Sequence, residues 1–289
     1  MPVSWLMNNS PTNPYNEMKW RDLTIVAFDT ETSGKYPLSA EICEIAAVKW
    51  RGGEVVETFE TLIKPVKPMP PENIAIHGIT NEMVETAPAI HEKIAEFHAF
   101  IEGAVVVAHH SPFDLGFVSH EFEKAGLSLP VAPALCSSLL SRKLFPESEN
   151  HRLQTLIKFF ALNQGTAHRA LDDTKACLDV ALRCLEKAGS DVTLSEVFNS
   201  QGGEIRWQRF SQADLLSARP INRVLAEAIT DQRRVTMTYT SGSNPGVPRI
   251  VQPEGLVRSL DGDFLVAYDE KDQRSKRFYV EKVTAAEFV

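Results

Sequence analysis

The stretch Leu23-Thr-Ile-Val-Ala-Phe28, followed by Asp29-Thr30-Glu31, decides the fold class. It is apolar and β-rich, which is typical of a strand buried on both faces, and it ends in two carboxylates. Side chains of a strand alternate between its faces, so Asp29 and Glu31 point the same way. Two adjacent carboxylates repel one another, and burying them without compensation is costly. A divalent cation between them would remove both problems.

The segments that follow this stretch predict an α/β domain with a mixed sheet flanked by helices. Residues 42–50 and 55–64 have the composition of two more strands, joined by a turn at residues 51–54. A further buried strand is predicted at residues 104–108. The alternation of helix and strand after the first hairpin is typical of a mixed sheet. Helical patterns occupy residues 89–101, 111–125, 137–145, 153–161 and 170–187.

Composition predicts two domains in the 289 residues. We expect a flexible arm at residues 1–20, the α/β domain at 21–188, a polar linker at 189–219 and a second domain at 220–289. Short β-rich runs with turn signals favour a small β-barrel or rolled sheet for the second domain. Residues 201–289 carry 13 basic and 12 acidic side chains, so the earlier part of the chain carries all of the negative net charge.

Charge and cysteine content narrow the class of protein. A net charge of −8 argues against a protein that coats nucleic acid, but it is compatible with an enzyme that grips a short strand through bound divalent cations. The four cysteines form no Cys-x-x-Cys pair, so neither a zinc site nor a disulfide framework is predicted. The chain shows no signal-peptide pattern and no apolar run that could span a membrane, so a reducing, cytoplasmic location is expected.

Two predicted helices place carboxylates on faces that should be apolar. Phe117 and Val118 mark the buried stripe of the helix that begins near Ser111, and Asp114 shares this stripe at a spacing of three and four residues. Taken alone, Asp114 is better explained by helix capping, because the helix dipole favours negative charge in the first turn. Asp173 continues the face that Cys177, Val180 and Cys184 mark on the last long helix.

The combination of these residues predicts phosphodiester hydrolysis. Oxygen-only ligands select hard cations, so Mg²⁺ or Mn²⁺ is implied. A cluster of three to four carboxylates typically holds two such ions, roughly 3.5–4 Å apart, for in-line attack at phosphorus. His168 lies five residues before Asp173, and a histidine titrates near neutrality, so it can accept a proton from the attacking water. On its own, His168 would be read as a polar surface residue.

Three motifs resemble those of the DEDDh exonucleases, the DnaQ-like group that includes bacterial proofreading subunits. They are Phe28-Asp-Thr-Glu-Thr-Ser-Gly34, Ala108-His-His-Ser-Pro-Phe-Asp114 and His168-Arg-Ala-Leu-Asp-Asp173. The resemblance covers roughly residues 22–187. It implies an RNase H-like fold and two-metal 3′→5′ hydrolysis that releases nucleoside monophosphates. It also implies metal ligation by Asp29, Glu31, Asp114 and Asp173, with His168 as the general base.

The same resemblance implies residues that bind substrate. Thr30 and Thr32 belong to the first motif, and the segment at residues 76–80 places His77 near the terminal nucleotide. Phe113 is a candidate for stacking on the last base, and core packing is an equally good interpretation. Two positions depart from the family pattern, namely His110 in place of Asn and Cys136-Ser137 in place of Asp-Thr. Neither departure touches the five catalytic positions.

The C-terminal segment resembles a WYL domain. The match lies in residues 235–239, 251–256, 263–268 and 277–283, although the Trp-Tyr-Leu that names the family is here Asp263-Phe-Leu265. The resemblance implies an SH3-like barrel that senses a ligand or nucleic acid. A basic cluster in this segment could grip phosphates, and an ordinary solvated strand face explains it slightly better. The cluster consists of Arg274, Lys276, Arg277 and Lys282.

The favoured hypothesis is a 3′→5′ exonuclease that acts on DNA with a single-stranded or 3′-terminal end. A 3′→5′ exoribonuclease is the first alternative, because the contact to a 2′-hydroxyl is not readable from motifs. The second alternative is a non-catalytic nucleic-acid sensor that uses the WYL-like domain. The intact five-residue set argues against it. No polymerase-docking segment is evident, so a polymerase partner is left open.

Overall fold

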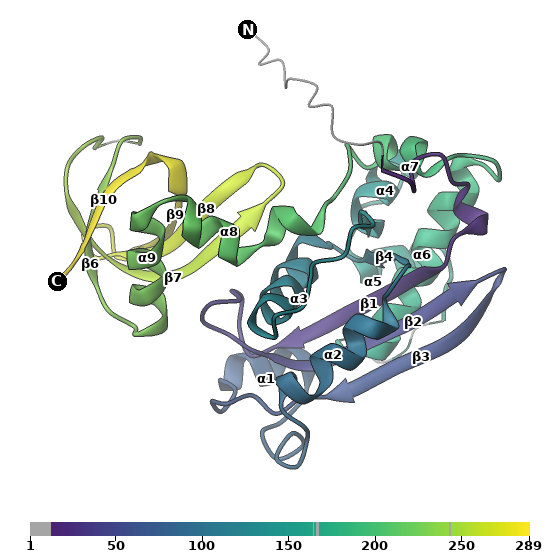
Figure 1. Ribbon diagram of the computed structural model, residues 1–289, viewed down its shortest axis with the longest axis horizontal. Coiled ribbons are helices and arrows are strands. Elements are labelled where there is room, and N and C mark those ends of the chain that lie inside the picture. The colour runs from purple at the N-terminus through teal and green to yellow at the C-terminus, as the bar shows by residue number, and fades with distance from the viewer. Residues whose placement is uncertain (1–12, 164, 166–167, 243) are drawn as a thin grey trace, which may run out of the picture.

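A five-stranded mixed sheet forms the centre of the first domain in the computed structural model, which describes residues 13–163, 165, 168–242 and 244–289 (Figure 1). The strand order is β3-β2-β1-β4-β5. The first three strands are antiparallel, whereas β4 and β5 pair in parallel, so the predicted mixed sheet is confirmed. The strands are β1 (Ile25–Thr32), β2 (Ile42–Arg51), β3 (Glu54–Leu62), β4 (Val105–Ala108) and β5 (Leu135–Cys136).

Strand β1 is buried on both faces, as its composition predicts. Val26 and Phe28 belong to one core cluster, while Ile25 and Ala27 belong to the other. Helices α2 (Ile90–Phe100) and α3 (Pro112–Lys124) cover the first face, and α6 (Ala170–Ala188) covers the second. Because side chains alternate, odd-numbered residues of β1 face α6 and even-numbered ones face α3. This alternation directs the carboxylates that end β1 toward α6.

The remaining helices of the first domain surround this sheet. Predicted helices at 137–145 and 153–161 correspond to α4 (Ser137–Leu144) and α5 (Leu153–Phe159), and a short helix α1 (Pro71–His77) follows β3. All four cysteines are free and buried, as expected of reduced thiols. Among the described residues, no helix is both long enough and apolar enough to cross a membrane.

The predicted flexible arm is partly packed. Its first twelve residues lie outside the described residues. Trp20 opens a short 3-10 helix (Trp20–Asp22), is only 1% exposed, and donates from its indole N–H to the carbonyl of Gly189 at 2.8 Å. Its ring stacks on Trp50. Residues 13–20 therefore lie against the first domain, because burial of one large aromatic side chain outweighs the polar composition of the segment.

The predicted linker is also structured. It contains α7 (Leu194–Ser200), a 3-10 helix (Trp207–Phe210) and α8 (Gln212–Ala218). Trp207 and Phe210 are almost fully buried and belong to the same core cluster as Phe28. A few well-spaced apolar residues thus anchor a segment whose average composition is polar, and the first domain extends beyond its predicted end.

The second domain is a five-stranded antiparallel sheet with order β10-β6-β7-β8-β9. Helix α9 (Pro220–Thr230) packs on it and shares its core cluster. Among the described strands, the two edges β10 and β9 do not pair, so the prediction of a closed SH3-like barrel is not confirmed. The strands are β6 (Val235–Tyr239), β7 (Arg249–Ser259), β8 (Gly262–Asp269), β9 (Arg274–Tyr279) and β10 (Val283–Phe288).

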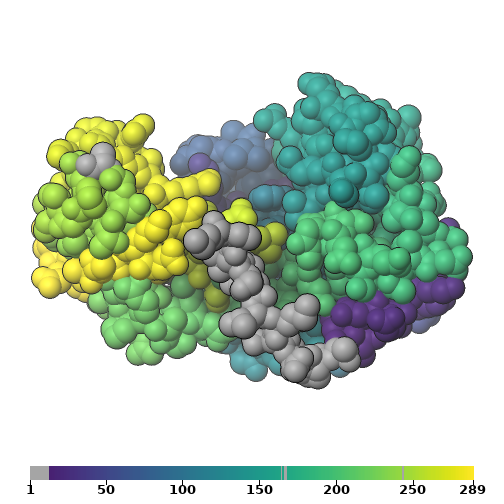
Figure 2. Space-filling view, turned by 90° about the horizontal axis from the view of Figure 1, so that it is seen from above, coloured from purple at the N-terminus to yellow at the C-terminus, as the bar shows by residue number. Residues whose placement is uncertain are grey.

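The two domains lie side by side as separate lobes in the space-filling view (Figure 2). Direct contacts join them. The carboxylate of Glu123 on α3 accepts hydrogen bonds from the backbone N–H of Gln212 at 3.0 Å and of Ala213 at 3.1 Å. Both lie at the start of α8, whose Leu215 belongs to the core cluster of the second domain. Ser39 in the loop after β1 donates to the carbonyl of Glu254 on β7 at 2.9 Å. The second domain is therefore held against the loop that leaves the central strand.

Candidate active site

The end of β1 carries the first part of the candidate site. Asp29 and Glu31 are its two half-buried residues on the face toward α6. Between them, Thr30 faces α3 and donates to Asp114 twice, from its backbone N–H at 3.1 Å and from its hydroxyl at 2.8 Å. Asp114 is only 2% exposed. The helix-capping interpretation of Asp114 is thus incomplete, because Thr30 fixes its carboxylate against the central strand.

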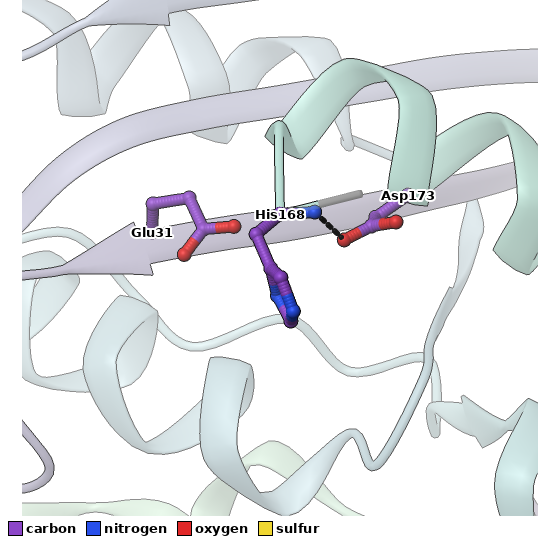
Figure 3. Close-up of side chains that lie close together, drawn as sticks. All are labelled: Glu31, His168 and Asp173. Carbon is purple, nitrogen blue, oxygen red and sulfur yellow. Dashed lines mark hydrogen bonds between the residues drawn. The ribbon is translucent and has the colours of Figure 1, made fainter. Parts of the chain in front are cut away.

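The start of α6 supplies the second part. The backbone N–H of His168 donates to Asp173 Oδ2 at 3.0 Å, and the side chain of Gln154 approaches Asp173 Oδ1 at 3.4 Å. Figure 3 shows His168 between Glu31 on β1 and Asp173 on α6. His168 is exposed and has a left-handed backbone, with φ of 61°. The turn before α6 therefore presents an accessible imidazole beside two carboxylates.

The structure brings some of the five predicted residues closer together than others. Potential ligand atoms of Glu31, His168 and Asp173 all lie within 4.8 Å of one another. Asp29 and Asp114 fall outside this group, although each is close enough for electrostatic coupling to the cluster. Sequence reasoning identified which elements meet, but it did not separate this tight triad from the two outer carboxylates.

The electrostatics of the cluster oppose ionisation. Burial and the neighbouring carboxylates of Asp114, Glu31 and Asp173 hold the pKa of Asp29 well above its usual range. Burial, together with Asp173 and other acidic neighbours, raises the pKa of Glu31 to about 8. Burial raises the pKa of Asp114 to about 7, against the opposing hydrogen bonds from Thr30. Asp173 is shifted in the same direction by burial.

A divalent cation fits this donor set. Four carboxylates that resist ionisation would regain their charge if a divalent cation lay among them, and oxygen donors are what Mg²⁺ and Mn²⁺ prefer. The residues that could hold them are Asp29, Glu31, Asp114 and Asp173. The presence of a single imidazole and no cysteine in the described group argues against a structural zinc site.

Glu44 is a buried acidic residue that sequence reasoning missed. It lies on β2 opposite Glu31, is 1% exposed, and pairs with Arg169 at 2.8 Å. It also accepts the backbone N–H of Ala170 at 2.9 Å. Glu44 therefore ties β2 to the turn that carries His168. A carboxylate inside an apolar strand was the available signal, whereas Asp29 and Glu31 were singled out as a pair that ends such a strand.

The predicted substrate-binding residues occupy different environments. His77 is 4% exposed, and its Nδ1 accepts the backbone N–H of Ile79 at 3.0 Å, so its ring is engaged within the fold. Thr32 is buried and donates to the carbonyl of Gly34 at 2.7 Å. Phe113 is 36% exposed and contacts Phe117 on its own helix. Of these residues, Phe113 is the one whose side chain remains available for a base.

The two departures from the family motifs lie at the same edge of the site. His110 is exposed and has φ of 68°. The hydroxyl of Ser137 lies 2.8 Å from Nδ1 of the preceding His109, and burial lowers the pKa of His109 to about 4. Ser137, at the start of α4, thus lies within hydrogen-bonding distance of the segment between β4 and α3, and neither departure falls on a carboxylate position.

Family models match both parts of the chain. The model described as "Exonuclease", of the RNase T type, matches residues 26–181, which is more than half of the chain. The model of the WYL domain matches residues 220–288. The boundaries of these matches agree with the two sheets, and the first match contains all five predicted catalytic residues.

Curated relatives share the first domain with this chain. A DNA polymerase III of the PolC type from Halalkalibacterium halodurans is 36% identical over 198 residues, which cover 68% of this chain and 14% of that protein. A DNA polymerase III subunit epsilon-like protein from Rhodobacter capsulatus is 44% identical over 168 residues, covering 56% of this chain and 24% of that protein. The chain therefore spans less than a quarter of the length of either relative.

Solved structures share the fold. The nuclease domain of 3′hExo, a DEDDh family member solved with bound rAMP, superimposes with a TM-score of 0.51 at 18% identity. The superposition covers 60% of this chain and 96% of that domain. The mixed sheet with its flanking helices is thus the arrangement of DEDDh nuclease domains, as the sequence motifs predict.

Proposed function

Since this chain belongs to the exonuclease family, whose model matches residues 26–181, we propose that it is a metal-dependent 3′→5′ exonuclease that releases nucleoside monophosphates from DNA. The observation that carries the proposal is the tight group of Glu31, His168 and Asp173, to which the carboxylates of Asp29 and Asp114 are electrostatically coupled. Such a set has no structural purpose that compensates for the burial of its charge. It matches what two-metal phosphodiester hydrolysis requires.

In this proposal each side chain has a defined task. Asp29, Glu31, Asp114 and Asp173 hold two divalent cations, which when bound supply positive charge at the phosphate and make water more acidic. His168 accepts the proton of the attacking water, since its ring is exposed beside Glu31 and Asp173. Thr30 keeps the Asp114 carboxylate in place, and Asp173 is oriented by the backbone of His168.

DNA is the proposed substrate because relatives of 36% and 44% identity are DNA polymerase III proteins by name. The matched region is only a small part of those proteins, so their polymerase activity is not carried over to this chain. An RNA substrate is the competing proposal. The nuclease domain of 3′hExo was solved with rAMP, but at 18% identity it supports the fold alone.

The test is a time course on a 5′-labelled single-stranded DNA oligonucleotide with Mg²⁺, with Mn²⁺ and with a chelator. We expect a ladder that shortens from the 3′ end with either metal. We expect no ladder with the chelator, and none for Asp173→Asn with metal. Asp179→Asn is the matched control, because it removes a carboxylate from the exposed side of the same helix and should leave the ladder intact.

The outcomes separate the competing functions. Digestion by Asp173→Asn at the wild-type rate would show that the assigned site is wrong. A wild-type protein that digests RNA of the same length, and leaves DNA intact, would replace DNA by RNA as the substrate. A protein that binds both and cuts neither with either metal would establish the binding-only alternative.

A further inference from the structure

A cavity of about 360 Å³ lies between the two domains. One wall belongs to the exonuclease domain, where the loop after β1 and the starts of α3 and α4 meet. The other wall belongs to the second domain and consists of the β7–β8 hairpin and part of β9. We call this feature the interdomain cleft. Its lining includes Lys35, Tyr36 and Phe113 on the first wall and Arg258, Phe264 and Arg277 on the second.

The interdomain cleft and the carboxylate cluster are built on the same two elements of the first domain. Phe113 lines the cleft and immediately precedes Asp114 in the first turn of α3. Lys35 also lines it, in the loop that leaves β1 just after Glu31. The first wall therefore contains one residue of α3 and one residue of the loop that follows β1, and both elements carry proposed metal ligands. A polymer whose last residue occupies the cluster can extend into the cleft.

The charge of the cleft is opposite to that of the molecule. Lys35, Arg258 and Arg277 line it together with one carboxylate, Asp261, although the net charge of the chain is −8. Arg258 donates to the carbonyl of Ser211 and pairs with the carboxylate of Asp263. Lys35 and Arg277 are exposed, and they stand on opposite walls. A phosphate backbone between the walls would meet a cation on each side.

Exposed aromatic surface is interleaved with this charge. Phe113 on the first wall is 36% exposed, and Phe264 on the second wall is partly exposed. The guanidinium of Arg277 lies 4.9 Å from the centroid of the Phe264 ring. Bases stack on aromatic rings and on guanidinium planes, whereas phosphates need cations. The combination is the pattern by which proteins hold single strands.

The walls of the cleft are fixed relative to one another. The Tyr36 ring packs so closely on Gly255 of β7 that a Cβ at that position would collide with it. Ser39, at the other end of the same loop, is hydrogen-bonded to the carbonyl of Glu254. The separation of the walls is therefore set by direct contacts between the domains, as a preformed binding site requires.

We propose that the interdomain cleft binds the single-stranded DNA that lies upstream of the terminal nucleotide, so that the WYL-like domain forms the second wall of the substrate channel. This proposal rests on the proposed exonuclease function. Within the basic cluster of the second domain, it assigns the phosphate contact to Arg277. Lys276 is instead paired with Asp269 and Asp272, and so it is already neutralised.

The test measures binding of a labelled oligothymidylate to the full chain in the presence of a chelator, where no digestion occurs. We expect Arg277→Glu and Lys35→Glu each to weaken binding about tenfold at low salt, which is the scale of reversing one phosphate contact. Each should also reduce the slope of log Kd against log salt by about 0.7, the value per contact for a single strand. A dinucleotide should be affected less than a long strand.

Arg274→Glu is the matched control, since it makes the same charge change on β9 three residues away, outside the cleft lining. It should bind as the wild type does. Wild-type affinity in both Arg277→Glu and Lys35→Glu overturns the proposal, as does a preference for oligouridylate over oligothymidylate of equal length. If the wild type digests DNA while both variants bind normally, the proposed role of the cleft is wrong and the exonuclease function stands. If binding depends on Arg277 but the wild type never digests DNA, the exonuclease function is wrong and the proposed role of the cleft stands.

Discussion

The two domains bury carboxylates in opposite ways. In the second domain, Asp269 is 1% exposed, and it pairs with Arg249 at 3.1 Å and with Lys276 at 3.3 Å. In the first domain, no described Lys or Arg forms an ion pair with Asp29, Glu31, Asp114 or Asp173. A buried carboxylate that the chain itself neutralises is structural, whereas a cluster left unneutralised calls for cations from outside.

The largest effect is expected from removing a carboxylate of the first-domain cluster, which should lower activity and raise stability. Asp29→Asn should reduce digestion of single-stranded DNA at least about a hundredfold, the scale of losing one essential electrostatic stabiliser. It should also raise the Tm of the metal-free protein at pH 8, because a carboxylate with a raised pKa is replaced by a neutral amide. Gel-based digestion and a thermal melt measure the two quantities.

The paired site should respond in the opposite sense. Asp269→Asn should lower the free energy of unfolding by about 3 kcal/mol, because two cations lose their buried partner, while per-molecule digestion of a dinucleotide persists. It serves as the control for Asp29→Asn. Full activity in Asp29→Asn, or a Tm at pH 8 below that of the wild type, would contradict the contrast between the two sites.

A second, smaller effect is expected at Glu44, a buried carboxylate beside the cluster that pairs with Arg169. Glu44→Gln should lower kcat on the order of tenfold with little change in KM, because Arg169 and the turn that presents His168 lose their anchor. The free energy of unfolding should fall by about 2 kcal/mol, as for a charged hydrogen bond lost in the interior. Initial rates over a range of DNA concentrations and a denaturant titration provide the measurements.

Glu57→Gln is the control for this change. Glu57 pairs with Lys49 at 2.7 Å on the neighbouring strand, but its side chain is 56% exposed. Removing such a surface pair should cost about 0–1 kcal/mol and leave kcat unchanged. Equal effects of the two substitutions on kcat would remove Glu44 from the set of residues that position the site.

The smallest expected effect is a shift of Tm with pH and metal. Glu31 has its pKa raised to about 8, so the folded state holds this proton more tightly than the unfolded chain, where the pKa is about 4.3. The stabilising contribution is full below the unfolded value and is lost as pH rises through about 8. Metal-free protein should therefore melt a few degrees lower at about pH 9 than at about pH 5.

Divalent cations should reverse this loss. Mn²⁺ should raise Tm at about pH 8, where the cluster can ionise around it, and have little effect at about pH 5. Asp269→Asn should keep this response, because its site is remote from the cluster. A melting temperature that ignores Mn²⁺ at both pH values would mean that the cluster does not bind the metal.

Local patterns predicted most strands and helices of the first domain and the inward placement of two candidate carboxylates. The apolar run before Asp29 fixed a central strand, and helical spacing placed Asp114 and Asp173 on inward faces. The segments at residues 13–20 and 189–219 were misjudged because their average composition is polar. In both, one or two aromatic residues, such as Trp20 and Trp207, decide the outcome by packing on residues far away in the chain.

The sequence by itself determined most strands and helices of the first domain and which carboxylates they carry, because strand and helix periodicity is local and depends on neighbouring residues. The tertiary structure alone decided how these parts meet. Glu44 and Arg169 stand 125 residues apart, and Lys35 and Arg277 belong to different domains. Pairings of this kind leave no periodic trace in the chain, since they depend on how the packed elements bring distant side chains together.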